Sequence, residues 1–419
     1  YSREMIDAAL TSEDPLSLVP SADESGHGTY AASIAAGGAN AEEQFLGAAP
    51  ETSIAMVKLK QAKEYLRDYY FIPRSAVCYQ ETDLMLGLKY LNDLADRLGL
   101  PLVVCITTGT NMGGHIGTLP FPYLIEGYST QANRITVIGT GNEADKRHHY
   151  YNVIAGSTDS RTVELRVGEN VSGFSLELWS DIPNVFSISM TSPSGESTSR
   201  IPFRVGAGAE IDFLFEKTKV SVDYRLLVEK STSELVFFRF QAPAPGIWKI
   251  LVEPLSSIDG NFHMWLPLTE FLSGEVYFLE SDPYYTLTAP ANTDSPVIVS
   301  WYNGNTGAVS QASGRGYTRT RDINPDITAP GADVRGALPG GRFSARSGSC
   351  VSAAVTAGAV ALMLEWLIYD QNVPGIDSYQ IKSLLILGAV RPGIMEYPNR
   401  EWGYGQLNLY NTFETMRQL

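Results

Sequence analysis

The stretch that decides the fold lies late in the chain, where residues 345–358 read ARSGSCVSAAVTAG. Gly348 and Ser349 form a turn, and the small residues that follow predict a helix whose amino end lies at Cys350, with its main body from about Ser352 to Tyr369. Backbone N–H groups at a helix amino end lack partners within the helix, and they stabilise an anion together with the helix dipole. We therefore expect the pKa of the Cys350 thiol to be lowered. A small residue that merely packs at a helix start is the plainer alternative, and the long patterned segment ahead of Cys350 argues against it.

A second motif surrounds His27, where residues 26–36 read GHGTYAASIAA. The histidine opens a predicted helix of small residues, which allows close packing in a core. A general base needs a ring that is held in place with one nitrogen free to face a nucleophile. The alternative is a histidine in a glycine-flanked turn, and this motif alone does not separate the two.

A third motif ends in Asn142, where residues 135–143 read ITVIGTGNE. The apolar run predicts a buried strand that places the Asn142 amide at its carboxyl end, where ligands bind in open parallel sheets. An amide there can donate to an oxyanion. A plain Gly-Asn turn is the alternative interpretation.

The arrangement of apolar runs predicts an α/β fold interrupted by an all-β insert. Leucines at helical spacing predict a helix over 81–98, and short apolar runs predict strands over 53–59, 101–107 and 135–139. Such alternation is typical of a parallel sheet with helices on both faces. Between about 156 and 285, segments rich in β-branched and aromatic residues recur between turns, which indicates an antiparallel sandwich, and we expect a jelly roll. The expected domains are 1–155 and 286–419 for the α/β part and 156–285 for the insert.

Composition excludes some classes of function. The 419 residues carry 46 Asp and Glu against 31 Lys and Arg, a formal net charge of -15, which argues against a nucleic-acid partner. No uncharged apolar run long enough to cross a bilayer is evident, so we expect no membrane span. The three cysteines are too scattered for a disulfide framework or a zinc site, and we expect no cofactor or metal. Because Tyr1 is not an initiator methionine, we expect the chain to begin within a longer protein.

Taken in order, these motifs resemble the subtilisin-like serine proteases, the subtilases. His27 falls on the family's His-Gly-Thr block, Asn142 on its oxyanion asparagine, and Cys350 on its nucleophilic serine. Residues 1–10, YSREMIDAAL, and residues 356–366, TAGAVALMLEW, resemble the Csp-type subtilases of clostridia, the spore-germination proteases. Outside the insert, the resemblance covers nearly the whole chain.

The resemblance implies an endopeptidase that hydrolyses a protein or peptide substrate. It implies that residues 106–111, and in particular Thr107, Thr108 and Gly109, line the extended substrate, and that the protein is bacterial and extracellular or spore-associated. Two departures stand out: no aspartate upstream of His27 follows an apolar strand, so we expect the catalytic aspartate on an amino-terminal fragment or prosegment, and Cys350 replaces serine.

The cysteine leaves three interpretations open: an engineered change, a natural thiol peptidase, or a decayed site in a pseudoprotease that serves as a regulatory or binding partner. Ser349 and Ser352, where the family prefers Thr and Ala, favour natural divergence. Elsewhere, His148 and His149 suggest metal binding, but we expect two adjacent loop histidines to be solvated. His115 and His263 are left unassigned.

Overall fold

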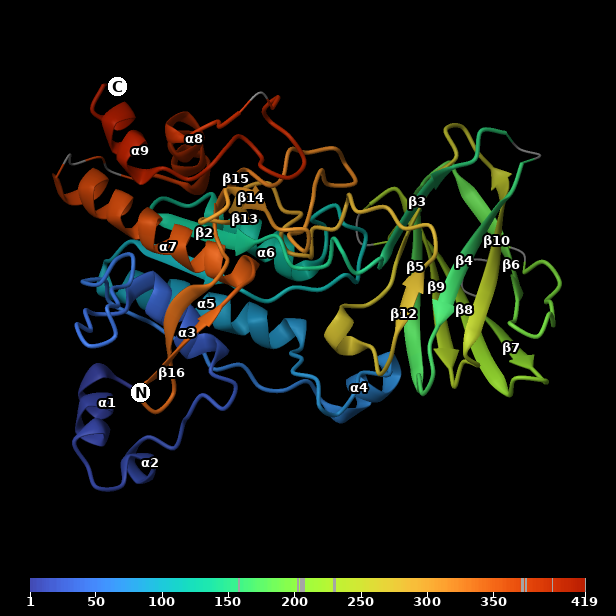
Figure 1. Ribbon diagram of the computed structural model, residues 1–419, viewed down its shortest axis with the longest axis horizontal. Helices are drawn as coiled ribbons and strands as arrows, with labels where there is room; N and C mark the ends of the chain where they lie inside the picture. The colour runs from blue at the N-terminus through green and yellow to red at the C-terminus, as the bar shows by residue number, and fades with distance from the viewer. Residues whose placement is uncertain are drawn as a thin grey trace.

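An α/β region and an all-β region lie side by side in the computed structural model of the chain (Figure 1). The structure describes residues 1–418 except 157–158, 202, 204–207, 229–230, 371–372, 374 and 394. The β strands of residues 149–278 gather at one end of the molecule, and the helices and both termini lie towards the other.

The α/β region is built on a mixed five-stranded sheet. Four strands run parallel in the order β1, β2, β13 and β15, and β14 pairs antiparallel with β13. Their bounds are Leu102–Ile106, Arg134–Gly139, Val297–Asn303, Ile327–Pro330 and Ala308–Val309. The strands are apolar along their length because both faces are covered, as the sequence predicts.

Two groups of helices cover the two faces of this sheet. On one face lie α5 (Glu81–Leu98) and α6 (Pro120–Ser129), whose apolar side chains share a core with Ile138 of β2. On the other lie α7 (Ser349–Glu365), α8 (Ser378–Gly388) and α9 (Leu409–Met416), which share a core with Val137. Adjacent residues of β2 therefore point to opposite cores, as the pleat of a strand requires.

The amino-terminal segments comprise α1 (Arg3–Leu10), α2 (Pro15–Leu18), α3 (His27–Ala36) and α4 (Glu64–Tyr70). Of these, α1 contacts α2, α3 packs against α7, and α4 lies against the all-β region. The strand predicted over 53–59 is wrong: these residues run without a ladder partner in the described part of the chain, and Ile54 and Met56 are each 57% exposed. Val57 lies against Gly87 of α5, so the segment is near the sheet but not paired with it.

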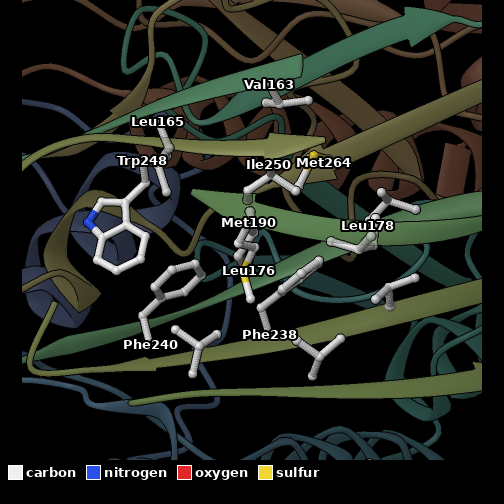
Figure 2. Packing of buried hydrophobic residues seen from close by; sticks show 14 of the residues in the cluster. Val163, Leu165, Leu176, Leu178, Met190, Phe238, Phe240, Trp248, Ile250 and Met264 are labelled. Carbon is white, nitrogen blue, oxygen red and sulfur yellow. The ribbon is translucent and has the colours of Figure 1, made fainter. Parts of the chain in front are cut away.

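The all-β region consists of two antiparallel sheets that share one core, shown in Figure 2. One sheet has the order β12, β4, β10, β6, and the other has the order β3, β11, β5, β9, β8, β7. In chain order, β3 to β12 span His149–Val153, Arg161–Val167, Gly173–Asp181, Val185–Thr191, Ala209–Phe213, Thr218–Leu226, Ser233–Gln241, Gly246–Ser256, Asn261–Trp265 and Val276–Phe278. Trp248 and Ile250 from one sheet face Phe238 and Phe240 from the other, all with 0% exposure. The expected all-β insert is present, and the jelly-roll topology stays a prediction.

The six-stranded sheet also buries its outer face, against the α/β region. Trp179 of β5 and Trp265 of β11 pack with Tyr70 and Met112 of the α/β part. The expectation that His148 and His149 are solvated is wrong, since they are 5% and 1% exposed. His148 lies 2.7 Å from a Glu143 oxygen, and His149 lies 3.0 Å from His263 in the junction between the two regions. His149 begins β3 and pairs with Trp265 of β11, a strand far along the chain, so local sequence does not show this burial.

The helix that begins at Ser349 also bears on the expected absence of a membrane span. Together with the π-helical turn Trp366–Asp370, α7 is long and apolar enough to cross a bilayer by composition alone, so the sequence does contain such a run. However, 67% of its most apolar window is buried inside the protein, which is typical of a core helix.

Candidate active site

Two helices that pack against each other bring the front and the back of the chain together. Tyr30 of α3 shares a small core with Val351 of α7, and Cys350 packs at its margin. Further along, a Cβ on Gly358 would lie 2.5 Å from the Ala35 carbonyl oxygen, so only glycine permits this approach. Because early residues of α3 meet early residues of α7 and late ones meet late ones, the helices run parallel. His27 and Cys350 therefore lie at the same end of the pair.

The Asn142 side chain lies at this same end. Its Oδ1 accepts a hydrogen bond of 3.0 Å from the Ser349 backbone N–H, which fixes the amide and leaves Nδ2 available as a donor. A Cβ on Gly348 would lie 3.4 Å from Asn142 Nδ2 and 3.5 Å from Cys350 Sγ. Gly348 also has φ +149°, which favours glycine, so the residue before the helix is fixed by both conformation and space.

The electrostatics of Cys350 differ from the expectation. Burial raises the pKa of the thiol, and the backbone N–H groups of Val351 and Cys350 and the Arg346 cation lower it less than burial raises it. The prediction of a lowered pKa is therefore wrong. The helix amino end acts as expected, but the sequence did not reveal how far the sulfur is withdrawn from water.

The pKa of His27 is lowered. Burial is the largest cause, and Arg346 adds to it, while Asp23 opposes both. A lowered pKa keeps the imidazole neutral near pH 7, which is the form a general base requires. In the described part of the chain, no hydrogen bond to the His27 ring is present.

Asp23, the nearest aspartate upstream of His27, is occupied elsewhere. It accepts hydrogen bonds from the backbone N–H and hydroxyl of Thr29 at 2.9 and 2.8 Å, and from the Gly26 N–H at 2.8 Å. Burial alone would raise its pKa, but these hydrogen bonds lower the pKa to about 2. Asp23 thus caps the amino end of α3, so its carboxylate is not free to orient His27.

The expected substrate-lining residues follow the carboxyl end of β1. Thr107, Thr108 and Gly109 are half-buried, and the next residue, Thr110, exchanges backbone hydrogen bonds of 2.9 and 2.8 Å with Ala289. They lie at the same edge of the sheet as Asn142, because β1 and β2 are parallel neighbours. Contact with a substrate stays a prediction.

The sequence motifs did not identify Arg346 and Tyr30 as members of the site. Arg346 ends the hairpin of β16 (Val334–Leu338) and β17 (Arg342–Arg346), and its guanidinium lies 5.2 Å from the centre of the Tyr30 ring. The only signal in the sequence is proximity, since Tyr30 lies three residues after His27 and Arg346 lies four residues before Cys350. Among the described residues, no group of three or more His, Cys, Asp and Glu that could hold a metal ion occurs.

Comparisons with known proteins identify the family of the chain. The model of the Subtilase family matches residues 10–71 and 260–405. This chain is similar to the solved structure of the CspB protease of Clostridium perfringens, with 31% sequence identity and a TM-score of 0.90. The match covers 100% of this chain and 87% of the CspB chain. Two solved structures match only 32% of this chain, each with a TM-score of 0.28. One is a point mutant of the protease domain of PatA (25% identity, 45% of that chain covered), and the other is the patellamide maturation protease PatA (26% identity, 48% of that chain covered). No curated protein matches the chain. The chain belongs to the subtilase family, as a Csp-type member, and is by family a subtilisin-like, serine-type endopeptidase.

Proposed function

We propose that the chain cleaves peptide bonds with Cys350 as the attacking group and His27 as the general base. The Asn142 side chain and the Cys350 backbone N–H would form the oxyanion hole. The observation that carries this proposal is that α3 and α7 run parallel, with His27 and Cys350 at one end beside the fixed Asn142 amide.

Each group has a defined task in this reaction. His27 takes the thiol proton as Cys350 Sγ bonds to the carbonyl carbon, and the resulting oxyanion accepts hydrogen bonds from Asn142 Nδ2 and the backbone N–H. When the tetrahedral species collapses, the C–N bond breaks and His27 returns the proton to the amine. Water then hydrolyses the thioester by the reverse sequence of proton transfers, which restores the thiol.

We further propose that the catalytic aspartate comes from an amino-terminal fragment or prosegment that adds a strand to the sheet. Among the described strands, β1 pairs with β2 alone, so one edge of β1 is open. Residues 53–59 run nearby without a ladder partner, with apolar side chains exposed. An unpaired strand edge is a template for a further strand, and its carboxyl end would lie at the same edge of the sheet as Asn142.

The peptide substrate would extend along Thr107, Thr108 and Gly109, with backbone hydrogen bonds as the main contacts. We also propose the division into 1–155, 156–285 and 286–419 and a jelly-roll topology for the insert. We also propose, from the resemblance of the sequence to the Csp-type subtilases, that the protein is bacterial and extracellular or spore-associated, with autoprocessing and a role in spore germination.

One observation favours a second function, a pseudoprotease that acts as a regulatory or binding partner. Burial raises the pKa of the Cys350 thiol, so the thiol form dominates near pH 7. A buried, protonated sulfur without an aspartate-oriented histidine is a poor nucleophile.

A thiol-reactive peptide probe separates the two functions. The full chain, with any upstream segment retained, is incubated with a peptidyl acyloxymethyl ketone, and labelled residues are mapped by mass spectrometry. Labelling of Cys350 that is lost in His27→Ala, but retained in the matched control Glu24→Ala, supports the endopeptidase. A correctly folded chain whose Cys350 stays unlabelled at pH 7 to 9 supports the pseudoprotease.

A further inference from the structure

The backbone of Arg346 is fixed by the helix that carries His27. The Tyr30 hydroxyl lies 3.2 Å from both the backbone nitrogen and the carbonyl oxygen of Arg346, and 2.5 Å from the Val334 carbonyl oxygen. Tyr30 is only 1% exposed, so this joint between α3 and the β16–β17 hairpin is rigid. Arg346 therefore has a set position relative to His27, three residues before Tyr30, and to Cys350, four residues after Arg346.

The side chain of Arg346 is directed back towards the site. Its guanidinium lies over the Tyr30 ring, and Nη2 lies 3.8 Å from the place that a Cβ on Gly26 would occupy. Within the described part of the chain, no Asp or Glu oxygen lies within 4.0 Å of this guanidinium, whereas Arg335 on the same hairpin pairs with Glu43. An uncompensated cation thus lies beside the residue that precedes His27.

The other titratable groups around Cys350 carry no positive charge. The groups that face the sulfur from neighbouring elements are Cys105 on β1 and Tyr30 on α3, both uncharged near pH 7 because burial raises the pKa of each to about 12. His27 is kept neutral by burial and by Arg346 itself, and Asp23 is occupied by the amino end of α3. Among these groups, only Arg346 offers a positive charge to a thiolate.

We propose that Arg346 is a positioning residue that stabilises the Cys350 thiolate, in place of the histidine cation that usually pairs with a catalytic cysteine. This inference rests on the proposed role of Cys350 as the attacking group. A serine nucleophile forms no resting anion that the cation could stabilise, so this role for Arg346 depends on the cysteine at position 350. When the resting thiol ionises, the proton leaves Sγ for solvent, whereas the thiol that attacks a peptide passes its proton to His27; Arg346 gains no covalent bond in either case.

The test is the pH dependence of alkylation at Cys350. The full chain and its variants react with iodoacetamide between pH 6 and 11.5, a range that extends above the raised pKa of the thiol, and mass spectrometry of the Cys350 peptide gives the rate apart from Cys78 and Cys105. We expect Arg346→Gln to move the midpoint of the profile upwards and to slow alkylation at pH 7.5 about tenfold, the equivalent of one pKa unit. Arg346→Lys should restore most of the rate, and the matched control Arg342→Gln, an exposed residue on the same strand, should leave the profile unchanged.

The rate at high pH, where the thiol is fully ionised, distinguishes charge from access. Converging plateaus with a shifted midpoint support the inference. A profile of Arg346→Gln that superimposes on the parent profile overturns it, as does equal slowing at every pH or a failure of Arg346→Lys to rescue. Alkylation does not require peptide hydrolysis, so it tests this inference separately from the proposed function. If the midpoint shifts but the chain cleaves no peptide, the proposed function is wrong and this inference stands. Cys350-dependent cleavage with an unshifted midpoint sinks this inference alone.

Discussion

Around α7 the buried side chains are small, whereas between the two sheets of the all-β region they are aromatic. Ala354 lies in the core that α3 and α7 share, and Gly358 lets the backbones of the two helices approach closely. In the all-β core, Phe238, Phe240 and Trp248 fill the space with rings at 0% exposure. Large side chains bury the most apolar area, and small ones allow the closest approach of helices.

The difference separates stability from chemistry. The aromatic core contributes much of the apolar burial that stabilises the fold. The closely packed helices α3 and α7 place His27 and Cys350 at one end of the pair, beside Asn142. If this separation is correct, substitutions in the two regions have opposite signatures.

The largest effect is expected from Cys350→Ala. Peptide hydrolysis should fall at least about a thousandfold, because no other group in the site can form the covalent intermediate. The midpoint of thermal unfolding should stay within a few degrees of the parent, since the site contributes little burial. Kinetics and calorimetry on one preparation measure both. Residual hydrolysis near the parent rate would place the chemistry elsewhere.

Phe238→Ala should produce the opposite signature. Removal of this ring, which Figure 2 shows between the two sheets, should lower the free energy of unfolding by about 3–5 kcal/mol. Urea unfolding measures the loss, and the alkylation rate of Cys350 in the folded protein should not change. A variant that remains folded but alkylates much faster at Cys350 would show that the two regions are coupled.

Asn142→Ala should act on the reaction alone. The side chain is exposed, so stability should change little, and kcat should fall about 10²–10³-fold, the effect of losing such a donor in subtilisin itself. Steady-state kinetics separate kcat from KM. A change confined to KM would mean that Asn142 binds substrate without stabilising the oxyanion.

The smallest expected effect lies in the all-β region, at Glu234. Burial raises its pKa to about 7, although hydrogen bonds from the Ser180 hydroxyl and the Phe186 N–H oppose this. Because the folded pKa exceeds the unfolded one, the contribution to stability is complete below about pH 4.5 and is lost as the pH rises through 7. Glu234→Gln does not titrate, so its stability relative to the parent should rise by roughly 2 kcal/mol between pH 5 and pH 8. Urea unfolding of both proteins at both pH values measures this difference in the free energy of unfolding. A difference that stays constant with pH would contradict the raised pKa of Glu234.

The sequence predicted the parts of the fold that local pattern determines. The helix over 81–98 and the strands near 101–107 and 135–139 are confirmed as α5, β1 and β2, because their apolar periodicity is strong and their ends carry turn residues. Residues 53–59 have the same pattern but lack a partner strand, and pairing cannot be read from one segment.

Within the candidate site, motifs found the groups but not their environment. His27, Asn142 and Cys350 stood out because glycines and small residues surround them. The burial that raises the pKa of Cys350, and the cation of Arg346, depend on packing between segments more than three hundred residues apart. The burial of His149 depends on packing of the same kind, since its partner strand β11 and His263 lie far along the chain.

The most direct test of the central claim is a cross-link between the two ends of the chain. In a Cys78→Ala, Cys105→Ala background, a His27→Cys variant is treated with dibromobimane, a short reagent that joins two thiols. We predict an intramolecular bridge to Cys350, found by peptide mapping, and none when Ser17→Cys on α2 replaces the His27 change. A folded variant in which position 27 and Cys350 react separately and never form a bridge would contradict the shared site.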